Sequence, residues 1–407
     1  MKALYIALLS TLLFSACKKN NPSSDSNGNG SIVNTATSLI PGFFKSGNSS
    51  TPTFTTISKS TDQLDHPCDL DFNPQNPGQL WVTTMGQSGA TVRNIIRPGD
   101  VVIYTNPGQS SQSSQSIPEM MKQHFIGNPT AISFAREQVN APIGAPLNPA
   151  PTDPTIPSRA QELTTVFAMS NDNDICPEGL GPTLWTADLS IYDPMANNHL
   201  DMLHNSPYSL GIEADSEYAF WTYSGFDGCV VRFNFLNPHV PGGSYHAGGE
   251  INKYPEVQLT KFNRPGNVPA HLVKDKATGW LYIVDGVGKQ ILRMNTQTGT
   301  RSANTDGGQN DPFPNPATQY TKTTGVTWEV FNNQNLQKPC GIELVGNILY
   351  VTDNATGEII AYNKNTKKEL ARVNTGKPGI MGIKADNNGQ LWYVNGTTNE
   401  VVRVDPQ

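Results

Sequence analysis

Residues that could bind a metal ion occur in short segments that begin with proline. His66, Cys68 and Asp69 lie around one proline, and His271 lies two residues after another. Imidazole, thiolate and carboxylate groups are the ligands that proteins offer to Zn²⁺ and related transition metals. These four residues are therefore candidate metal ligands if the fold brings their segments together. The alternative is structural, with both histidines simply hydrogen-bonded to loop carbonyl groups.

Tyrosines in similar segments could take part in acid or base catalysis. Tyr208 directly follows a proline, as Cys68 does, and Tyr223 ends an aromatic run further along. A phenol beside a metal ion can donate or accept a proton in lyase or hydrolase chemistry. The motifs G-x-S-x-G and H-E-x-x-H, a phosphate-binding loop and C-x-x-C-H are all absent from the sequence. Whether the protein is an enzyme therefore stays open.

Two polar runs offer the oxygen ligands that hard cations prefer. They extend from Asn171 to Asp174 and from Asp306 to Asp311, and both are dense in carboxylate and amide groups. Neither run has EF-hand spacing, and ordinary solvated turns have the same composition. Zn²⁺ and Ca²⁺ are thus the two cofactors that the sequence suggests.

The elements that must position these residues are clearest in a repeat near the C-terminus. One unit begins KPCGIELVGNILYVTD at Lys338, and the next begins KPGIMGIKADNNGQLWYV at Lys377. Each has a proline, then three short strands with alternating apolar residues, separated by turns rich in Gly, Asn and Asp. A three- or four-stranded antiparallel meander that recurs in tandem is typical of a β-propeller blade.

Four earlier units begin in the same way, so we expect an all-β propeller of six blades. They start at HPCDLDF, NPTAISF, SPYSLGI and VPAHLVK. The last unit has only three strands, and we expect residues 52–59 to supply its fourth, which would close the ring. Insertions separate the strands: a proline-rich loop at 138–160, a turn at 171–183, and a polar excursion at 300–325 before an outer strand VTWEVF. Such insertions could also hide a seventh blade.

The chain reverses once per strand, so the turn between second and third strands lies on the face where first strands begin. We expect the site on this face, around the central channel. The polar residues there are His66, Cys68, Asp69, Asn128, Thr130, Tyr208, Ser209, His271, Lys338, Cys340 and Lys377. Cys176 and Cys229 lie in turns of adjacent blades on this face and are the candidate disulfide pair, although other pairings remain open.

The order P-x-G-I, then G-x-L-Y/W-V-x-D/N, then a polar turn and a hydrophobic strand resembles the NHL repeat of six-bladed β-propellers. Such propellers include enzymes, binding platforms and scaffolds. A weaker resemblance is to peptidyl-hydroxyglycine lyases, and it implies a zinc ion held by histidines at the starts of first strands. The sequence departs from that pattern, because His66 precedes its proline and no third histidine is in register unless His204 contributes.

The N-terminus predicts export. Residues 1–17 combine a lysine, an apolar run too short to span a membrane and Ser-Ala-Cys, which resembles the lipobox of bacterial lipoproteins with Cys17 as the acylated residue. Residues 18–50 are polar and suit a flexible tether, and residues 51–407 form the propeller. The CKKN start resembles lipoproteins of Bacteroidota-like bacteria, which indicates the outer membrane or cell surface, with the periplasmic side still open.

Charge and composition then limit the function. The net charge of −6 and the absence of a basic patch argue against nucleic acid. The leading hypothesis is a lipid-anchored binding or scaffold module for a protein, peptide or carbohydrate, with Trp185, Tyr208, Trp221 and Tyr223 near the ligand. The alternative is a metal-dependent lyase or hydrolase, in which His66 and His271 bind the ion.

Overall fold

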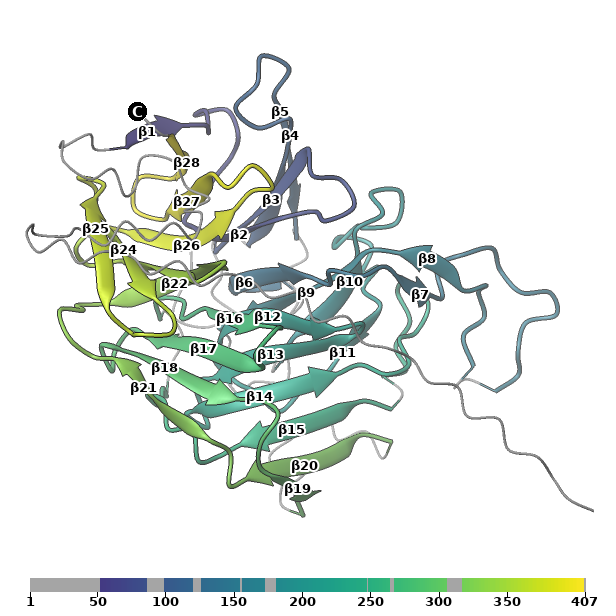
Figure 1. Ribbon diagram of the computed structural model, residues 1–407. Helices are drawn as coiled ribbons and strands as arrows, with labels where there is room; N and C mark the ends of the chain where they lie inside the picture. Colours follow the sequence, from purple (N-terminus) through teal and green to yellow (C-terminus); the bar gives the residue numbers. More distant parts are fainter. Residues whose placement is uncertain are drawn as a thin grey trace, which may run out of the picture. The chain divides into compact units, whose positions relative to one another are not determined.

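A computed structural model describes residues 52–85, 99–119, 126–153, 156–172, 181–246, 248–263, 267–305 and 317–405. Six sheets are arranged around a centre at which the first strand of each sheet lies (Figure 1). These innermost strands are β2 (Pro67–Phe72), β6 (Pro129–Phe134), β12 (Ser209–Ser216), β16 (Leu272–Asp275), β22 (Pro339–Val345) and β26 (Ile380–Ala385). The six-bladed propeller expected from the repeats is confirmed.

Each innermost strand is followed outward by antiparallel neighbours. Blades one and two add β3 (Gln79–Thr84), β4 (Asp100–Thr105), β5 (Ser113–Pro118), β9 (Val166–Asn171), β10 (Thr183–Thr186) and β11 (Asp201–Met202). Blades three and four add β13 (Ala219–Ser224), β14 (Cys229–Asn234), β15 (Glu250–Tyr254), β17 (Trp280–Asp285), β18 (Gln290–Asn295) and β21 (Trp328–Asn332). Blade five adds β23 (Ile348–Asp353), β24 (Glu358–Asn363) and β25 (Glu369–Asn374), and blade six adds β27 (Leu391–Asn395) and β28 (Glu400–Asp405). The segment VTWEVF supplies the outer strand of blade four, as expected.

The N-terminal strand closes the ring. β1 (Thr53–Thr56) pairs antiparallel with β28, with Thr53 opposite Asp405 and Thr56 opposite Val402. The amide of Ile57 continues this ladder by donating to the carbonyl of Val401 at 2.8 Å. The expectation that residues 52–59 complete the last blade is confirmed, and the pairing covers an edge of β28 that would otherwise be exposed.

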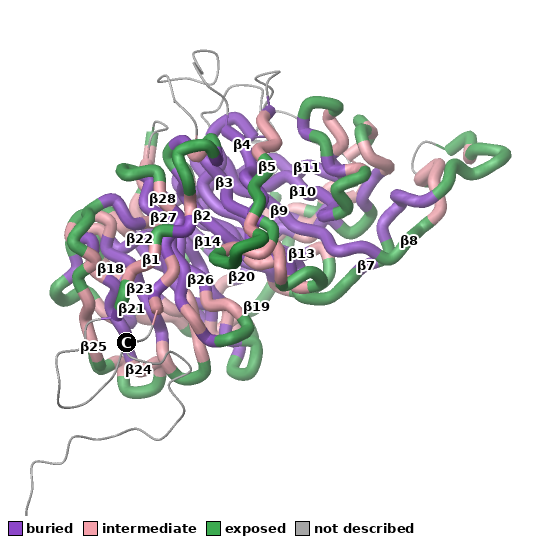
Figure 2. The backbone as a smooth tube through the Cα atoms, turned by 90° about the horizontal axis from the view of Figure 1, so that it is seen from above, coloured by how far each residue is buried: buried purple, intermediate pink, exposed green. Residues whose placement is uncertain are grey.

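The insertion in blade two contains a hairpin. β7 (Val139–Ala141) pairs with β8 (Glu162–Thr164), and an isolated bridge joins Pro146 to Arg159. This ribbon projects from the side of the propeller and has an exposed tip (Figure 2). The extended loop predicted at 138–160 therefore lies between the first and second strands of blade two as expected, but part of it is paired strand.

The polar excursion at 300–325 also contains strands. β19 (Thr300–Ala303) pairs with β20 (Gln319–Thr324), and β20 runs parallel to β15, which widens the sheet of blade three to six strands. The side-chain oxygen of Asn252 accepts hydrogen bonds from the hydroxyls of Thr321 at 3.1 Å and Thr323 at 3.3 Å. These side-chain bonds join the insertion from blade four to blade three.

Interdigitated aromatic and aliphatic side chains fill the space between blades. Trp81 of blade one packs edge-on against Phe134 and Phe167 of blade two, with ring centroids 5.4 and 5.1 Å apart. All three rings are buried, so the blades are held together by apolar packing. Among the described residues, none belongs to a helix that is long and apolar enough to cross a membrane.

The closing segment should contribute measurably to stability. Ile57 is 5% exposed and packs in a cluster with Leu70, Leu80 and Val401. We expect Ile57→Ala to lower the free energy of unfolding by about 2–4 kcal/mol, because it leaves a cavity beside the seam. The matched control is Val287→Ala, whose side chain is 59% exposed and whose loss should change stability by less than about 0.5 kcal/mol. Chemical denaturation measures both, and equal effects would contradict a stabilising role for the seam.

Candidate functional site

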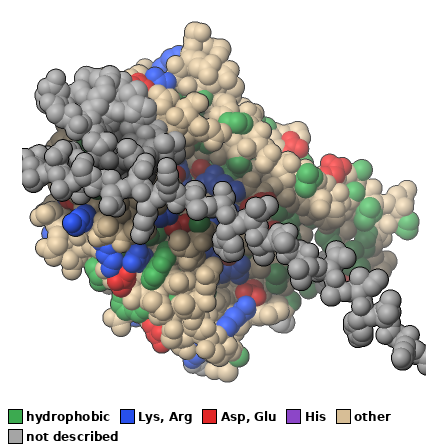
Figure 3. Space-filling model, viewed as in Figure 1, with side chains coloured by type: hydrophobic (Ala, Val, Ile, Leu, Met, Phe, Trp, Pro, Cys, Tyr) green, Lys and Arg blue, Asp and Glu red, His purple; other side chains and the backbone are tan. Residues whose placement is uncertain are grey.

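Six charged side chains, one from each blade, surround the channel where the innermost strands end. We call this side of the propeller the end face, and the opposite side, where the innermost strands begin, the start face. In blade order the residues are Asp71, Arg136, Glu213, Lys274, Glu343 and Lys384. Acidic and basic residues alternate around this charged ring, so that each charge has neighbours of opposite sign. Basic and acidic side chains are also intermingled on the part of the described surface that Figure 3 shows.

Ion pairs connect the ring across blades. The guanidinium of Arg136 lies 3.2 Å from the carboxylate of Asp71. The ammonium of Lys384 lies 3.4 Å from Glu343 and 3.9 Å from Glu213, which joins blade six to blades five and three. Burial raises the pKa of Glu343 to about 7, while the neighbouring ammonium of Lys384 opposes that rise. The charged ring therefore connects different blades through ion pairs and also offers several hydrogen-bond donors and acceptors at one place.

A cavity of about 400 Å³ lies at this end of the channel. All six members of the charged ring line it, together with Phe72, Asn73, Lys276 and Asn387. The side chains of Arg136 and Lys276 are 38% and 44% exposed, so their cationic groups can reach a ligand from solvent. The residues that line this cavity lie at or just beyond the ends of the innermost strands. The sequence analysis had instead predicted a site on the face where these strands begin.

The start face brings two of the candidate metal ligands together. Asp69 and His271 are both buried, and Oδ1 of Asp69 lies 3.4 Å from Nδ1 of His271. The other carboxylate oxygen of Asp69 accepts a hydrogen bond from the amide of Ile132 at 3.0 Å. Nε2 of His271 lies 3.1 Å from the carbonyl oxygen of Thr130. A carbonyl oxygen only accepts, so Nε2 carries the hydrogen and Nδ1 has a lone pair.

These contacts determine where the proton of the pair resides. Burial lowers the pKa of His271 to about 3, so the imidazole is neutral at pH 7. Burial raises the pKa of Asp69 to about 8, against the attraction of Lys384. Two facing lone pairs would repel, whereas a protonated carboxyl group can donate to Nδ1. We therefore interpret Asp69 and His271 as a neutral pair that shares one proton.

The innermost strands lie very close together at this level. A Cβ atom on Gly382 would lie 2.3 Å from Oδ1 of Asp69, and one on Gly341 would lie 2.2 Å from the carbonyl oxygen of Met381. Cys68 is fully buried, and its thiol contacts the carbonyl oxygen of Pro129 at 3.2 Å. The innermost strands approach so closely here that glycine is required, and Oδ2 of Asp69 and Nε2 of His271 already have partners within the protein.

The other candidate residues lie apart from this pair. The side chain of His66 is 52% exposed, and its Nδ1 lies 2.7 Å from Asp65. Tyr208 is buried, and the hydroxyl of Tyr223 donates to the carbonyl oxygen of Thr260 at 2.6 Å. Trp185 and Trp221 are also buried. The four aromatic side chains that we expected near a ligand are therefore all buried, and Trp221 also lines a cavity of about 410 Å³.

Several sequence predictions fall wholly or partly outside the described residues. Cys17 and Cys176 lie outside them, as do the run from Asp306 to Asp311 and the end of the run from Asn171 to Asp174. Cys229 is buried and has no disulfide partner among the described residues. The disulfide, the lipid modification and the calcium sites accordingly stay predictions.

A second group of titratable residues lies at the periphery, and the sequence analysis missed it. His199, His239 and His246 have ring nitrogens that all lie within 4.8 Å of one another. Among the described residues, no other group of three or more His, Cys, Asp or Glu side chains meets this criterion. Burial lowers the pKa of His239 to about 4. A sequence signal existed, because four of the seven histidines lie between positions 199 and 246.

Similarity to known proteins was found at the level of three-dimensional structure. No family model matches the chain, and no curated protein matches its sequence. An auxiliary nutrient binding protein from Bacteroides thetaiotaomicron VPI-5482 is 11% identical with a TM-score of 0.48 over 87% of this chain and 75% of that one. A streptogramin B lyase is 11% identical, with a TM-score of 0.44 over 88% and 98%. A chain of a nidogen/laminin complex is 12% identical, with a TM-score of 0.42 over 78% and 84%.

The neutral Asp69–His271 pair predicts a pH dependence of stability. The folded pKa of Asp69 is raised, so its stabilising contribution is complete below the unfolded pKa of 3.8 and is lost as pH rises towards about 8. In Asp69→Asn the amide can donate to Nδ1 of His271 without an ionisable group. From pH 6 to pH 7.5 we expect the variant to gain about 2 kcal/mol relative to the wild type.

Chemical denaturation of the wild type and the variant at both pH values measures this difference. The other titrating groups are the same in the two proteins, so their contributions cancel in the comparison. His271, whose folded pKa is lowered, loses its contribution as pH falls, but it does so in both proteins and cancels. A difference that stays constant with pH would show that Asp69 is ionised in the folded protein.

Proposed function

We propose that this chain is an exported, lipid-anchored propeller of NHL type that binds a peptide segment carrying both positive and negative charges. The observation that carries the proposal is the cavity of about 400 Å³ on the end face: the charged ring of three acidic and three basic side chains lines it in alternation, and Lys276 adds a fourth basic side chain. The Ser-Ala-Cys motif ending at Cys17 and the polar composition of residues 18–50 support the export and anchoring parts of the proposal.

The chemistry of the lining favours a polar ligand with both signs of charge. Carboxylates such as Glu343 accept hydrogen bonds, and cations such as Lys276 donate them, within the same cavity. A ligand of one sign would meet repulsion from half of the charged ring. Phe72 is the one aromatic residue among the described residues that line the cavity, so a sugar ring would find little stacking surface. A peptide with mixed charge fits this lining better than a neutral carbohydrate does.

Peptide selection tests the binding site. Immobilised protein should enrich, from a random displayed peptide library, sequences that contain both Lys or Arg and Asp or Glu. Lys276→Glu reverses an exposed charge at the cavity and should weaken the selected peptides by about tenfold, with a smaller effect at high salt. Lys289→Glu makes the same change at an exposed lysine in the turn between β17 and β18, on the start face, and should leave the affinity unchanged.

Two results would refute this ligand class. One is equal affinity of the selected peptides for both variants, which would place binding elsewhere. The other is enrichment of uncharged peptides, or competition of the selected peptides by neutral oligosaccharides, which would favour a carbohydrate. Circular dichroism of both variants checks that the propeller remains folded.

The anchor has its own test. We expect Cys17→Ala to move the full-length protein from the membrane fraction to the soluble fraction of an expressing bacterium, because the acylated thiol is lost. Metabolic labelling with a fatty-acid analogue should mark the wild type and leave the variant unlabelled. Membrane association that persists in the variant would contradict attachment through Cys17.

A further inference from the structure

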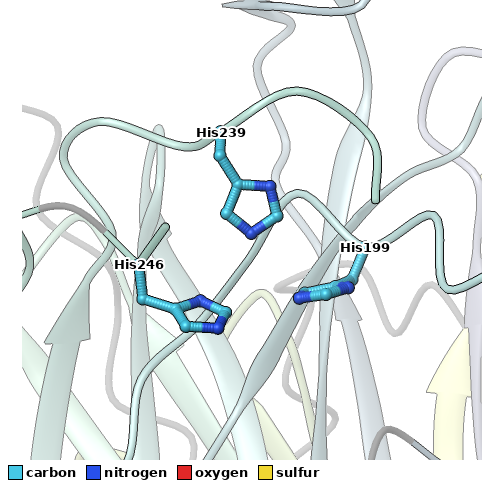
Figure 4. A group of neighbouring side chains, drawn as sticks. All are labelled: His199, His239 and His246. Atoms are coloured by element: carbon cyan, nitrogen blue, oxygen red, sulfur yellow. The ribbon is translucent and has the colours of Figure 1, made fainter. Parts of the chain in front are cut away.

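We propose that His199, His239 and His246 bind a Zn²⁺ ion at the outer edge of the propeller, between blades two and three. The three rings point towards one another (Figure 4), and their ring nitrogens lie within 4.8 Å of one another. Three imidazoles are a ligand set found in zinc sites that keep one coordination position for water or another small ligand.

In each of the three rings, Nδ1 already lies within hydrogen-bond distance of an oxygen atom. Nδ1 of His199 lies 2.9 Å from the carbonyl oxygen of Asn197, and Nδ1 of His239 lies 2.7 Å from that of Val240. Nδ1 of His246 lies 3.1 Å from the carboxylate of Asp201. Each Nδ1 can therefore donate its hydrogen, which gives all three rings the tautomer with a lone pair on Nε2. The same outer contacts, to carbonyl or carboxylate oxygens, orient histidine ligands in known metal sites.

One of these lone pairs has no hydrogen-bond donor among the described residues. Nε2 of His239 is buried, and no hydrogen-bond partner for it occurs among the described residues. The whole residue is only 8% exposed. A buried polar atom without a partner is costly, and a metal ion shared with the two neighbouring rings would satisfy it.

The two loops that carry the histidines are tied together before any ion binds. His199 precedes β11 of blade two, whereas His239 and His246 lie between β14 and β15 of blade three. The amide of His239 donates to the carbonyl of Leu200 at 2.8 Å, and the amide of Gly242 donates to that of His199 at 3.1 Å. These backbone bonds hold rings from two blades at one point, so little ordering is required on binding.

A glycine makes room for one of the rings. A Cβ atom on Gly243 would lie 2.7 Å from Nδ1 of His239, so a larger residue there would displace the imidazole. A cavity of about 200 Å³ adjoins the loop and is lined in part by His239, Tyr245 and Asp153. The three histidines are therefore held in place by their loops, and an open cavity lies beside one of them.

Zinc titration of purified full-length protein without a polyhistidine tag tests the proposal. After treatment with a chelator and dialysis, calorimetry with Zn²⁺ should detect one ion per chain. His246→Asn should weaken the affinity by about a hundredfold or more, because one ligand is lost while the asparagine can still contact Asp201. Asp201→Asn should weaken it by about tenfold, because the outer carboxylate that orients His246 loses its charge.

His66→Asn discriminates this site from the channel, and asparagine tolerates the positive φ of 53° at that position. We expect it to bind Zn²⁺ as the wild type does. Loss of zinc in this variant, with retention in His246→Asn, would overturn the proposal and place the ion on the start face. Co²⁺ gives an independent readout: the wild type should show the visible absorption of a nitrogen-ligated ion, and His246→Asn should not. Absence of stoichiometric zinc and of this absorption in the folded wild type would also overturn it.

Discussion

The packing of six innermost strands around one axis is the constraint on which the rest of this structure depends. Neighbouring innermost strands belong to different sheets, so side chains make many of the contacts between them. Asp69 and Asp71 accept hydrogen bonds from the amides of Ile132 and Phe134, both at 3.0 Å, and the hydroxyl of Thr130 donates to the carbonyl of Ser209 at 2.6 Å. Carboxylates and hydroxyls near the axis thus join neighbouring blades, together with backbone bonds such as that from the amide of His271 to the carbonyl of Cys340 at 3.0 Å. The close approach demands glycine at some of the facing positions.

Ionisable side chains are buried at both ends of the channel, but the two ends compensate the cost of that burial in different ways. On the start face, Asp69 and His271 are both buried, and we interpret them as a neutral pair, so that no charge would have to leave water. On the end face, six ionisable side chains alternate between acidic and basic, and the ammonium of Lys384 lies within 3.9 Å of the carboxyl groups of both Glu213 and Glu343. Buried ion pairs are weak stabilisers because desolvation opposes them. The proposed recognition of a charged ligand would account for their retention around an accessible cavity.

The sequence predicted those features that repeat locally and missed those that depend on contacts between distant segments. The tandem units at the C-terminus predicted blades five and six, and the missing fourth strand predicted closure by β1. The parallel pairing of β20 with β15 was not predicted, because no local pattern encodes which distant strand an insertion will join. The charged ring was missed for a similar reason: Arg136 lies beyond its repeat motif, and alternation in sign is visible only when the blades are placed in a circle. His199, His239 and His246 lie in connecting loops that have no repeat to align.

The exchange of strands between blades three and four has a consequence for how such a protein can change over time. β20 is encoded within the unit of blade four, but it pairs with β15 and extends the sheet of blade three. Duplication or excision of blade four as a gene segment would therefore also alter the outer edge of its neighbour. The seam between β1 and β28 is different, because the blade there is already assembled from both ends of the propeller sequence. A circular permutation that moved the termini to another exposed turn would join these ends covalently. We therefore expect this fold to accept new positions for its termini more readily than the gain or loss of a blade.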